Sequence, residues 1–247
     1  MTTRDHGFED LADHLGSAYL RYSFTKGTAQ EVRFLLEVLG LEPGMRVLDV
    51  GCGPGRHSRA LGEQGIEVLG IDISQRFVDL AREDAPPGVT FERLDARALP
   101  FDGEFDAAIS LCQGAFGLAD WGPDVARLDP DLEILQGISR ALKPGGRAAV
   151  TAFSAYFQVR HTEAMGSTFH VERGVNEERT TIKDEQGRDA PADLWTSCFT
   201  PRELRLMAQQ VGLSVEAIWS VTPGGYGREE PTMDSEEFLL VAGKPRS

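Results

Sequence analysis

The chain has 247 residues, 41% of them hydrophobic, and its 25 basic against 39 acidic residues give a net charge of −14 at neutral pH. This length fits one large α/β domain with room for an embedded subdomain. A strongly negative field repels phosphate backbones and anionic lipid surfaces. We therefore expect neither nucleic acid nor a membrane as a partner.

The cysteines and the apolar runs bear on where the protein works. Cys52, Cys112 and Cys198 show neither paired metal-ligand spacing nor an even disulfide framework. The N-terminus lacks the apolar core of a signal peptide, and no apolar run reaches the roughly 20 residues of a membrane span. The sequence predicts a soluble cytoplasmic protein without a bound metal ion, present as a monomer or a homodimer.

Residues 7–40 have a helical pattern with a break near their middle. Apolar residues recur at helical spacing from position 32 to position 39 and stop at Gly40, which is a natural helix end. Before this stripe, Tyr19 and Tyr22 are interleaved with arginine and serine, so they are less easily assigned to the core.

The segment 46–72 organises the rest of the chain. A short apolar run at 47–50 stops at glycine, and the pattern after Pro54 is compatible with a helix. A second apolar run at 66–71 ends in the acidic Asp72. This is a strand–loop–helix–strand unit, and such units are almost always right-handed and build parallel sheets.

The loop of this unit has glycine at positions 51, 53 and 55, where the backbone bends sharply and a ligand can approach closely. A dinucleotide-binding turn has its third glycine at the sixth position of the fingerprint, where helix and strand pack closely. Here that position is Arg56. The arginine would crowd the packing, so a dinucleotide is disfavoured.

Asp49 followed by Gly51, Gly53 and Gly55 resembles the first loop of the class I S-adenosylmethionine-dependent methyltransferases. The resemblance covers residues 46–153 and, more loosely, the C-terminal strands. It implies S-adenosylmethionine as the cofactor. A purely structural turn, the alternative for these glycines, would not require an acidic residue at the end of the next strand.

The resemblance also implies a set of cofactor-binding positions beyond the glycines and Asp49. Cys52 lies inside the loop. Asp72, about 20 residues after the loop, is placed to accept hydrogen bonds from both ribose hydroxyls; its alternative is a cap for the next helix. Ile73 is expected beside the adenine, and Asp95 and Ala96 match positions that contact the adenine amino group and ring.

The fourth strand ends in Leu111 and Cys112, followed by Gln113 and Phe116. The Asn/Asp-Pro-Pro-Tyr/Phe signature of enzymes that methylate base amines or glutamine is absent, and no proline precedes a cysteine as in cytosine carbon methylation. We therefore expect a small-molecule acceptor. Leu111 and Cys112 are assigned to the cofactor site, Cys112 being a buried small residue rather than a nucleophile. Gln113 is expected to orient the acceptor, with Phe116 beside it.

A sulfonium is an activated methyl donor, so transfer by in-line displacement depends mostly on alignment and exclusion of water. A general base is needed only if the acceptor must lose a proton. His57, at the start of the helix after the glycine loop, is the candidate for this role, and it is otherwise part of the cofactor-binding turn.

The second half of the chain continues the alternation of helices and strands. A helix at 132–142, with Asp129 and Asp131 expected in solvent at its start, precedes a strand at 147–153. Extended runs at 168–175, 178–183 and 194–199, the first two separated by residues 176 and 177, indicate an antiparallel sheet.

These elements predict a doubly wound α/β fold. By resemblance, its Rossmann-like sheet has seven mostly parallel strands in the order 3-2-1-4-5-7-6, with helices on both faces and a small antiparallel insertion after the fifth strand. The core comprises residues 41–154 and 200–247. Residues 1–40 form a helical lid that carries Tyr19 and Tyr22, and residues 155–199 cover the substrate.

The function predicted from this pattern is methyl transfer to a nitrogen or oxygen of a small-molecule acceptor. Two alternatives remain open from the sequence. One is a nicotinamide-dependent oxidoreductase, which Arg56 and the lack of a second nucleotide fingerprint disfavour. The other is a non-catalytic S-adenosylmethionine-binding module, because the acceptor site carries no signature.

Overall fold

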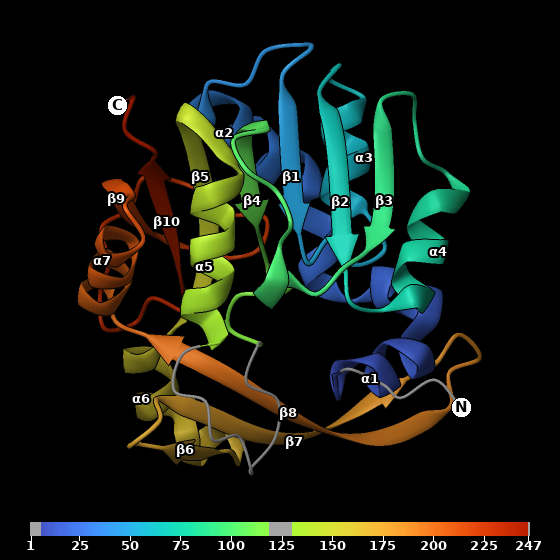
Figure 1. Ribbon diagram of the computed structural model, residues 1–247. Coiled ribbons are helices and arrows are strands. Elements are labelled where there is room, and N and C mark those ends of the chain that lie inside the picture. The colour runs from blue at the N-terminus through green and yellow to red at the C-terminus, as the bar shows by residue number, and fades with distance from the viewer. Residues whose placement is uncertain (1–5, 119–129, 247) are drawn as a thin grey trace.

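The computed structural model describes residues 6–118 and 130–246, and its centre is a twisted, mostly parallel sheet (Figure 1). The first five strands in the chain pair in parallel. They are β1 (Arg46–Val50), β2 (Glu67–Asp72), β3 (Val89–Arg93), β4 (Phe105–Ser110) and β5 (Leu142–Ser154). The buried strands β1, β2 and β4 are nearly continuous apolar runs, as expected where helices cover both faces.

The C-terminal pair, β9 (Ser214–Val221) and β10 (Glu237–Gly243), completes the core sheet. β10 lies antiparallel between β5 and β9. Numbered along the core, the strand order is therefore 3-2-1-4-5-7-6, which confirms the prediction.

The insertion after β5 contains a helix, α6 (Ala155–Met165), and three strands, β6 (Thr168–His170), β7 (Val175–Lys183) and β8 (Asp189–Phe199). β6, β7 and β8 are antiparallel neighbours, and the end of β8 pairs with the end of β5. The antiparallel insertion is confirmed, but α6 was not predicted. The expected separation of two extended runs by residues 176 and 177 was wrong, since both residues lie inside β7 and the chain turns at 171–174.

Helices cover the two faces of the sheet. α2 (Thr28–Leu39), α3 (Arg56–Gly62) and α4 (Gln75–Glu83) share one apolar core with the sheet, and α5 (Pro130–Ala141) and α7 (Pro201–Gln210) share the other. In Figure 1, α5 lies before the sheet and α2 and α3 lie behind it. α7 begins with a capping box formed by Thr200 and Glu203.

Helix α1 (Phe8–Leu15) and two 3-10 turns, η1 (Gly16–Arg21) and η2 (Ser23–Gly27), lie at the carboxyl edge of the parallel strands. The side chains of Leu11 and Leu15 pack with Phe77 of α4 and Ile182 of β7 in a third apolar cluster. Figure 1 shows α1 between this edge and the β7–β8 hairpin. A remaining 3-10 turn, η3 (Ala96–Ala98), follows β3. Within the described residues, no helix has the length and apolar character needed to cross a bilayer.

Candidate active site

The glycine loop between β1 and α3 has a backbone that other residues rarely adopt. Gly51, Gly53 and Gly55 have φ angles of 74°, 54° and 81°. A Cβ on Gly51 would lie 2.2 Å from the carbonyl carbon of Gly114, in the loop after β4. Glycine at position 51 therefore lets two strand-end loops touch, which side chains would prevent.

Backbone hydrogen bonds fasten this loop to the end of β2. The N–H groups of Gly51 and Cys52 donate to the carbonyl oxygen of Ile71 at 2.8 and 2.9 Å. The Gly53 N–H donates to Asp72 Oδ2 at 2.9 Å, and the Ser74 N–H donates to Asp72 Oδ1 at 2.8 Å. The cap of α4 is Ser74, whose hydroxyl accepts from a helix N–H, so Asp72 does not act as that cap.

Asp72 is a buried acid that is held entirely by backbone donors. Burial raises its pKa to about 7, although the two hydrogen bonds lower it. Each carboxylate oxygen can accept a further hydrogen bond. The side chain lines both cavities at this edge of the sheet and fits the role of a ribose ligand.

The smaller cavity, about 40 Å³, lies beyond the ends of β2 and β3. It brings together five predicted cofactor-binding residues: Gly51, Asp72, Ile73, Asp95 and Ala96. The Asp95 carboxylate accepts hydrogen bonds from the Arg97 backbone and guanidinium, which hold its pKa below the usual value although burial opposes this.

The larger cavity, about 410 Å³, begins at Gly51, Gly53 and Asp72 and extends under α1 and the β7–β8 hairpin. Most of its wall is apolar or aromatic. Tyr19 and Tyr22, predicted as lid residues, belong to this wall. A Cβ on Gly53 would lie 3.7 Å from the Tyr19 ring, so this ring sits directly over the glycine loop.

Cys112 and Gln113 bring polar groups to this cavity after β4. They are the two non-glycine residues with positive φ in the described chain, at 51° and 50°. Such a conformation costs about 1–3 kcal/mol for each residue and is most often found at functional sites. Burial raises the pKa of the Cys112 thiol to about 12, so it stays protonated at neutral pH and is a poor nucleophile.

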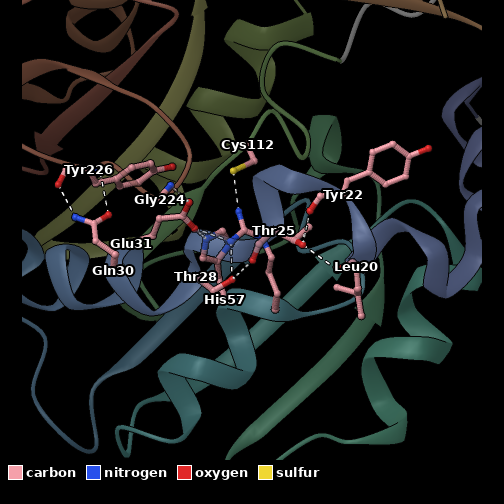
Figure 2. Close-up of polar contacts among 11 residues, drawn as sticks. Leu20, Tyr22, Thr25, Thr28, Gln30, Glu31, His57, Cys112, Gly224 and Tyr226 are labelled. Atoms are coloured by element: carbon pink, nitrogen blue, oxygen red, sulfur yellow. Dashed lines mark hydrogen bonds and ion pairs between the residues drawn. The ribbon is translucent and has the colours of Figure 1, made fainter. Parts of the chain in front are cut away.

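A buried carboxylate network supports the loop from behind (Figure 2). Glu31 of α2 is fully buried, and its Oε2 atom lies 2.5 Å from Arg56 Nη1 and 2.7 Å from His57 Nε2. Its Oε1 atom accepts from the Gly224 N–H at 2.8 Å. Arg56 Nη2 then reaches Cys112 Sγ at 2.9 Å, so the network joins α2, α3 and the β9–β10 loop to the strained turn.

The geometry does not support His57 as a base that contacts the acceptor. Its imidazole is buried, faces Glu31 and lines neither cavity. Burial lowers its pKa, although Glu31 opposes this. The arrangement favours the alternative, in which His57 belongs to the support of the cofactor-binding turn.

Phe116 likewise does not reach the acceptor cavity. Its ring is fully buried and stacks on Phe199, with centroids 4.9 Å apart. The apolar residue after β4 was expected beside the acceptor, but the chain folds it back into the core under α5 and α7.

The other predicted cofactor residues lie behind the cavity wall. The Asp49 carboxylate accepts from the Ser58 hydroxyl at 2.6 Å. Cys52 and Leu111 belong to the core, and a Cβ on Gly55 would meet the Phe91 ring at 2.7 Å. These residues shape the loop rather than line the cavities.

Asp131 and Glu31 are buried acids; the prediction for Asp131 was wrong, and Glu31 was not singled out from the sequence. Asp131 was expected in solvent, but it is buried and accepts from the Gly117 N–H at 2.6 Å; Asp129 lies outside the described residues. Glu31 had a readable signal, because it precedes Leu35 by four residues on the apolar stripe of α2. A third buried acid, Glu237, lines the larger cavity and carried no sequence signal.

Comparisons with known proteins identify the family of this chain. The methyltransferase domain family matches residues 47–146. The cypemycin N-terminal methyltransferase of a Streptomyces species is 30% identical over 213 residues, which are 80% of this chain and 82% of that protein. The demethylmenaquinone methyltransferase of Beutenbergia cavernae is 38% identical over 123 residues, 49% of this chain and less than half (46%) of that protein.

Among solved structures, the CcbJ methyltransferase from Streptomyces caelestis aligns with a TM-score of 0.74 at 18% identity, covering 99% of this chain and 98% of that one. At this identity the match supports the fold alone. Together with the relatives above, it places the chain among the class I S-adenosylmethionine-dependent methyltransferases. The protein is therefore an enzyme that takes its methyl group from S-adenosylmethionine, rather than a nicotinamide-dependent oxidoreductase or a non-catalytic binding module.

The Glu31 network predicts a stability effect. Glu31→Ala leaves the Arg56 guanidinium buried without its carboxylate, and breaking a buried pair costs about 3–5 kcal/mol. Denaturant unfolding measures this loss. Glu216→Ala is the control, because it removes an exposed ion pair with Arg147 and should change the unfolding free energy by less than about 1 kcal/mol. Equal effects of the two substitutions would contradict a stabilising role for the Glu31 network.

Asp72 predicts the affinity for the cofactor. In the folded protein the pKa of the Asp72 carboxyl group is about 7, above the ordinary value of 3.8, so without cofactor this group is protonated below about pH 7. The carboxyl group must lose its proton to accept hydrogen bonds from both ribose hydroxyls. The affinity for S-adenosylmethionine should therefore rise as the pH increases through 7 and level off above it. Asp72→Asn should lower affinity about tenfold or more and flatten this dependence.

Calorimetric titration measures both effects. Asp79→Asn is the matched control, because it makes the same change at an exposed aspartate of α4, the helix that follows Asp72. Unchanged affinity in Asp72→Asn would remove Asp72 from the ribose site.

Proposed function

We propose that this protein transfers a methyl group from S-adenosylmethionine to a nitrogen or oxygen atom of a small-molecule acceptor. The supporting observation is the larger cavity, which continues from the glycine loop and Asp72 to the strained turn at Cys112 and Gln113. Its volume of about 410 Å³ falls within the range of small-molecule sites.

The residues of this chain would contribute orientation and a dry environment. The cofactor supplies an activated methyl group, and holding two reactants in line can contribute about 7–11 kcal/mol. Asp72 and the glycine loop would hold the adenosyl part, and Gln113 would orient the acceptor. Tyr19 would exclude water; burial raises its pKa, so its phenol stays neutral.

We further propose that residues 1–40 act as a lid and residues 155–199 as a cover over a core of residues 41–154 and 200–247. The support is a contact between these two parts. Glu185, in the β7–β8 turn, accepts from the Ser17 N–H at 2.8 Å and from Arg76 Nη2 at 2.7 Å, and its carbonyl oxygen accepts from Arg21. A bound cofactor left uncovered by both parts would contradict this division.

A second candidate acceptor is the α-amine of a peptide. It is favoured by one observation: the relative of which this chain covers 82% is, by its name, a methyltransferase for the N-terminus of cypemycin. The quinone methyltransferase match covers 46% of that protein and gives weaker support for a quinone acceptor.

We also propose a reducing compartment such as the cytoplasm, because all three cysteines are free.

The test is transfer of a deuterated methyl group from labelled S-adenosylmethionine to a library of amines, phenols, carboxylic acids and short peptides, read by mass spectrometry. We expect label on a nitrogen or oxygen of a small molecule, with an equal amount of S-adenosylhomocysteine. Label on peptides alone would favour the second candidate. Label on carbon, or no transfer while the cofactor binds, would contradict the proposal.

A further inference from the structure

Glu237 is the first residue of β10, and the topology places it at the ligand edge of the sheet. Because β10 runs antiparallel to β5, its start lies opposite the end of β5, where Glu237 pairs with Phe153. The carboxyl ends of parallel strands form the binding edge of such sheets. Both residues line the larger cavity, and Glu237 is only 6% exposed.

The Glu237 carboxyl group is not satisfied by the protein. Within residues 6–118 and 130–246, its Oε2 atom has no hydrogen-bond partner, and neither has Nε2 of Gln113 beside it. Burial raises the pKa of Glu237 to about 7, although the Gln113 side chain lowers it. Buried polar atoms are almost always paired in folded proteins, and both residues line the larger cavity, so a polar group bound there would complete their hydrogen bonds.

The side chains around Glu237 provide no cation that is free to pair with it. Arg56 is the nearby positive charge, and Glu31 already pairs with it. Cys112 and Tyr226 also face Glu237, and burial raises the pKa of each, so both are neutral. Glu236 adds a further negative charge. A cationic ligand would therefore meet an uncompensated carboxylate.

The rest of the wall suits an apolar cation. The rings of Tyr19, Tyr22, Phe24, Phe77 and Phe153 line the same cavity. Aromatic faces attract ammonium groups, most strongly where water is excluded.

We propose that Glu237 binds the methyl acceptor as an ammonium ion and takes its proton, so that the acceptor is an apolar amine. This inference rests on the proposed function and narrows its acceptor from nitrogen or oxygen to an amine nitrogen. The amine of a small molecule and that of a peptide N-terminus share this chemistry.

The proposed step balances in protons and electrons. The ammonium nitrogen gives one proton to the Glu237 carboxylate and becomes a neutral amine. Its lone pair forms the new nitrogen–carbon bond, while the sulfur–methyl bond breaks and its electron pair stays on the sulfur. The product is a methylated ammonium ion and a neutral thioether, and the Glu237 proton passes to solvent when the product leaves.

The test measures binding in the S-adenosylhomocysteine complex, so it needs no turnover. The probes are benzylamine and benzyl alcohol, which have the same ring and differ in charge. Titration calorimetry at pH 8, above the Glu237 pKa of about 7, should show benzylamine binding at least tenfold more tightly than the alcohol. Glu237→Gln should abolish this preference. Glu236→Gln is the control, because it makes the same change at an exposed neighbour and should keep the preference.

Lowering the pH through 7 should weaken benzylamine binding in the wild type and not in Glu237→Gln. A preference that survives Glu237→Gln, or no preference for the amine in the wild type, would overturn the inference. Methyl transfer to hydroxyl compounds alone would overturn it while leaving the proposed function intact. Failure of all transfer would instead count against the proposed function, whatever the probes bind.

Discussion

The hydrogen bond from the Gly53 N–H to Asp72 Oδ2 connects the glycine loop at the start of the first strand–helix–strand unit with the residue that ends this unit. It fixes the glycine loop after β1 against the end of β2. With the loop fixed, Gly51 can touch Gly114, and the turn after β4 is brought to the same edge. The cavities that line this edge depend on that arrangement, because each takes part of its wall from Asp72.

The buried acids around this edge differ in what compensates their charge. Asp49 has the Ser58 hydroxyl, Glu31 has a guanidinium and an imidazole, and Asp72 has two backbone N–H groups. The Arg56 and His57 contacts outweigh burial and lower the pKa of Glu31 to about 2, whereas Asp72 and Glu237 remain near 7. A carboxyl group that titrates near neutrality suits proton exchange with a ligand, while one held at low pKa suits a permanent charge.

The fold, and the clustering of the residues proposed for the cofactor at one edge, could be predicted because their signals are local. The glycine spacing, the acid that ends β2, and Asp95 with Ala96 after β3 each follow a strand, and parallel strands end at one edge. The acceptor side could not be predicted in the same way. Glu237 reaches the cavity only because β10 is antiparallel, and the Glu236–Glu237 pair resembles a solvated strand start.

His57 and Phe116 show the limit of proximity in sequence. Both residues lie close in sequence to loops that form the site. The His57 side chain, however, forms a hydrogen bond with Glu31 of α2, and the Phe116 ring stacks on Phe199 of β8. Side-chain direction depends on these distant partners, which the spacing of motifs does not reveal.

The central claim is that one edge of the sheet holds the adenosyl group on Asp72 and presents its sulfur to the larger cavity. A crystal structure of the complex with S-adenosylhomocysteine tests it most directly. We predict both ribose hydroxyls on the Asp72 carboxylate, the adenine beside Ile73 and Ala96, and the sulfur facing Gln113 and Glu237. A nucleoside bound elsewhere, or a sulfur turned away from that cavity, would contradict the account.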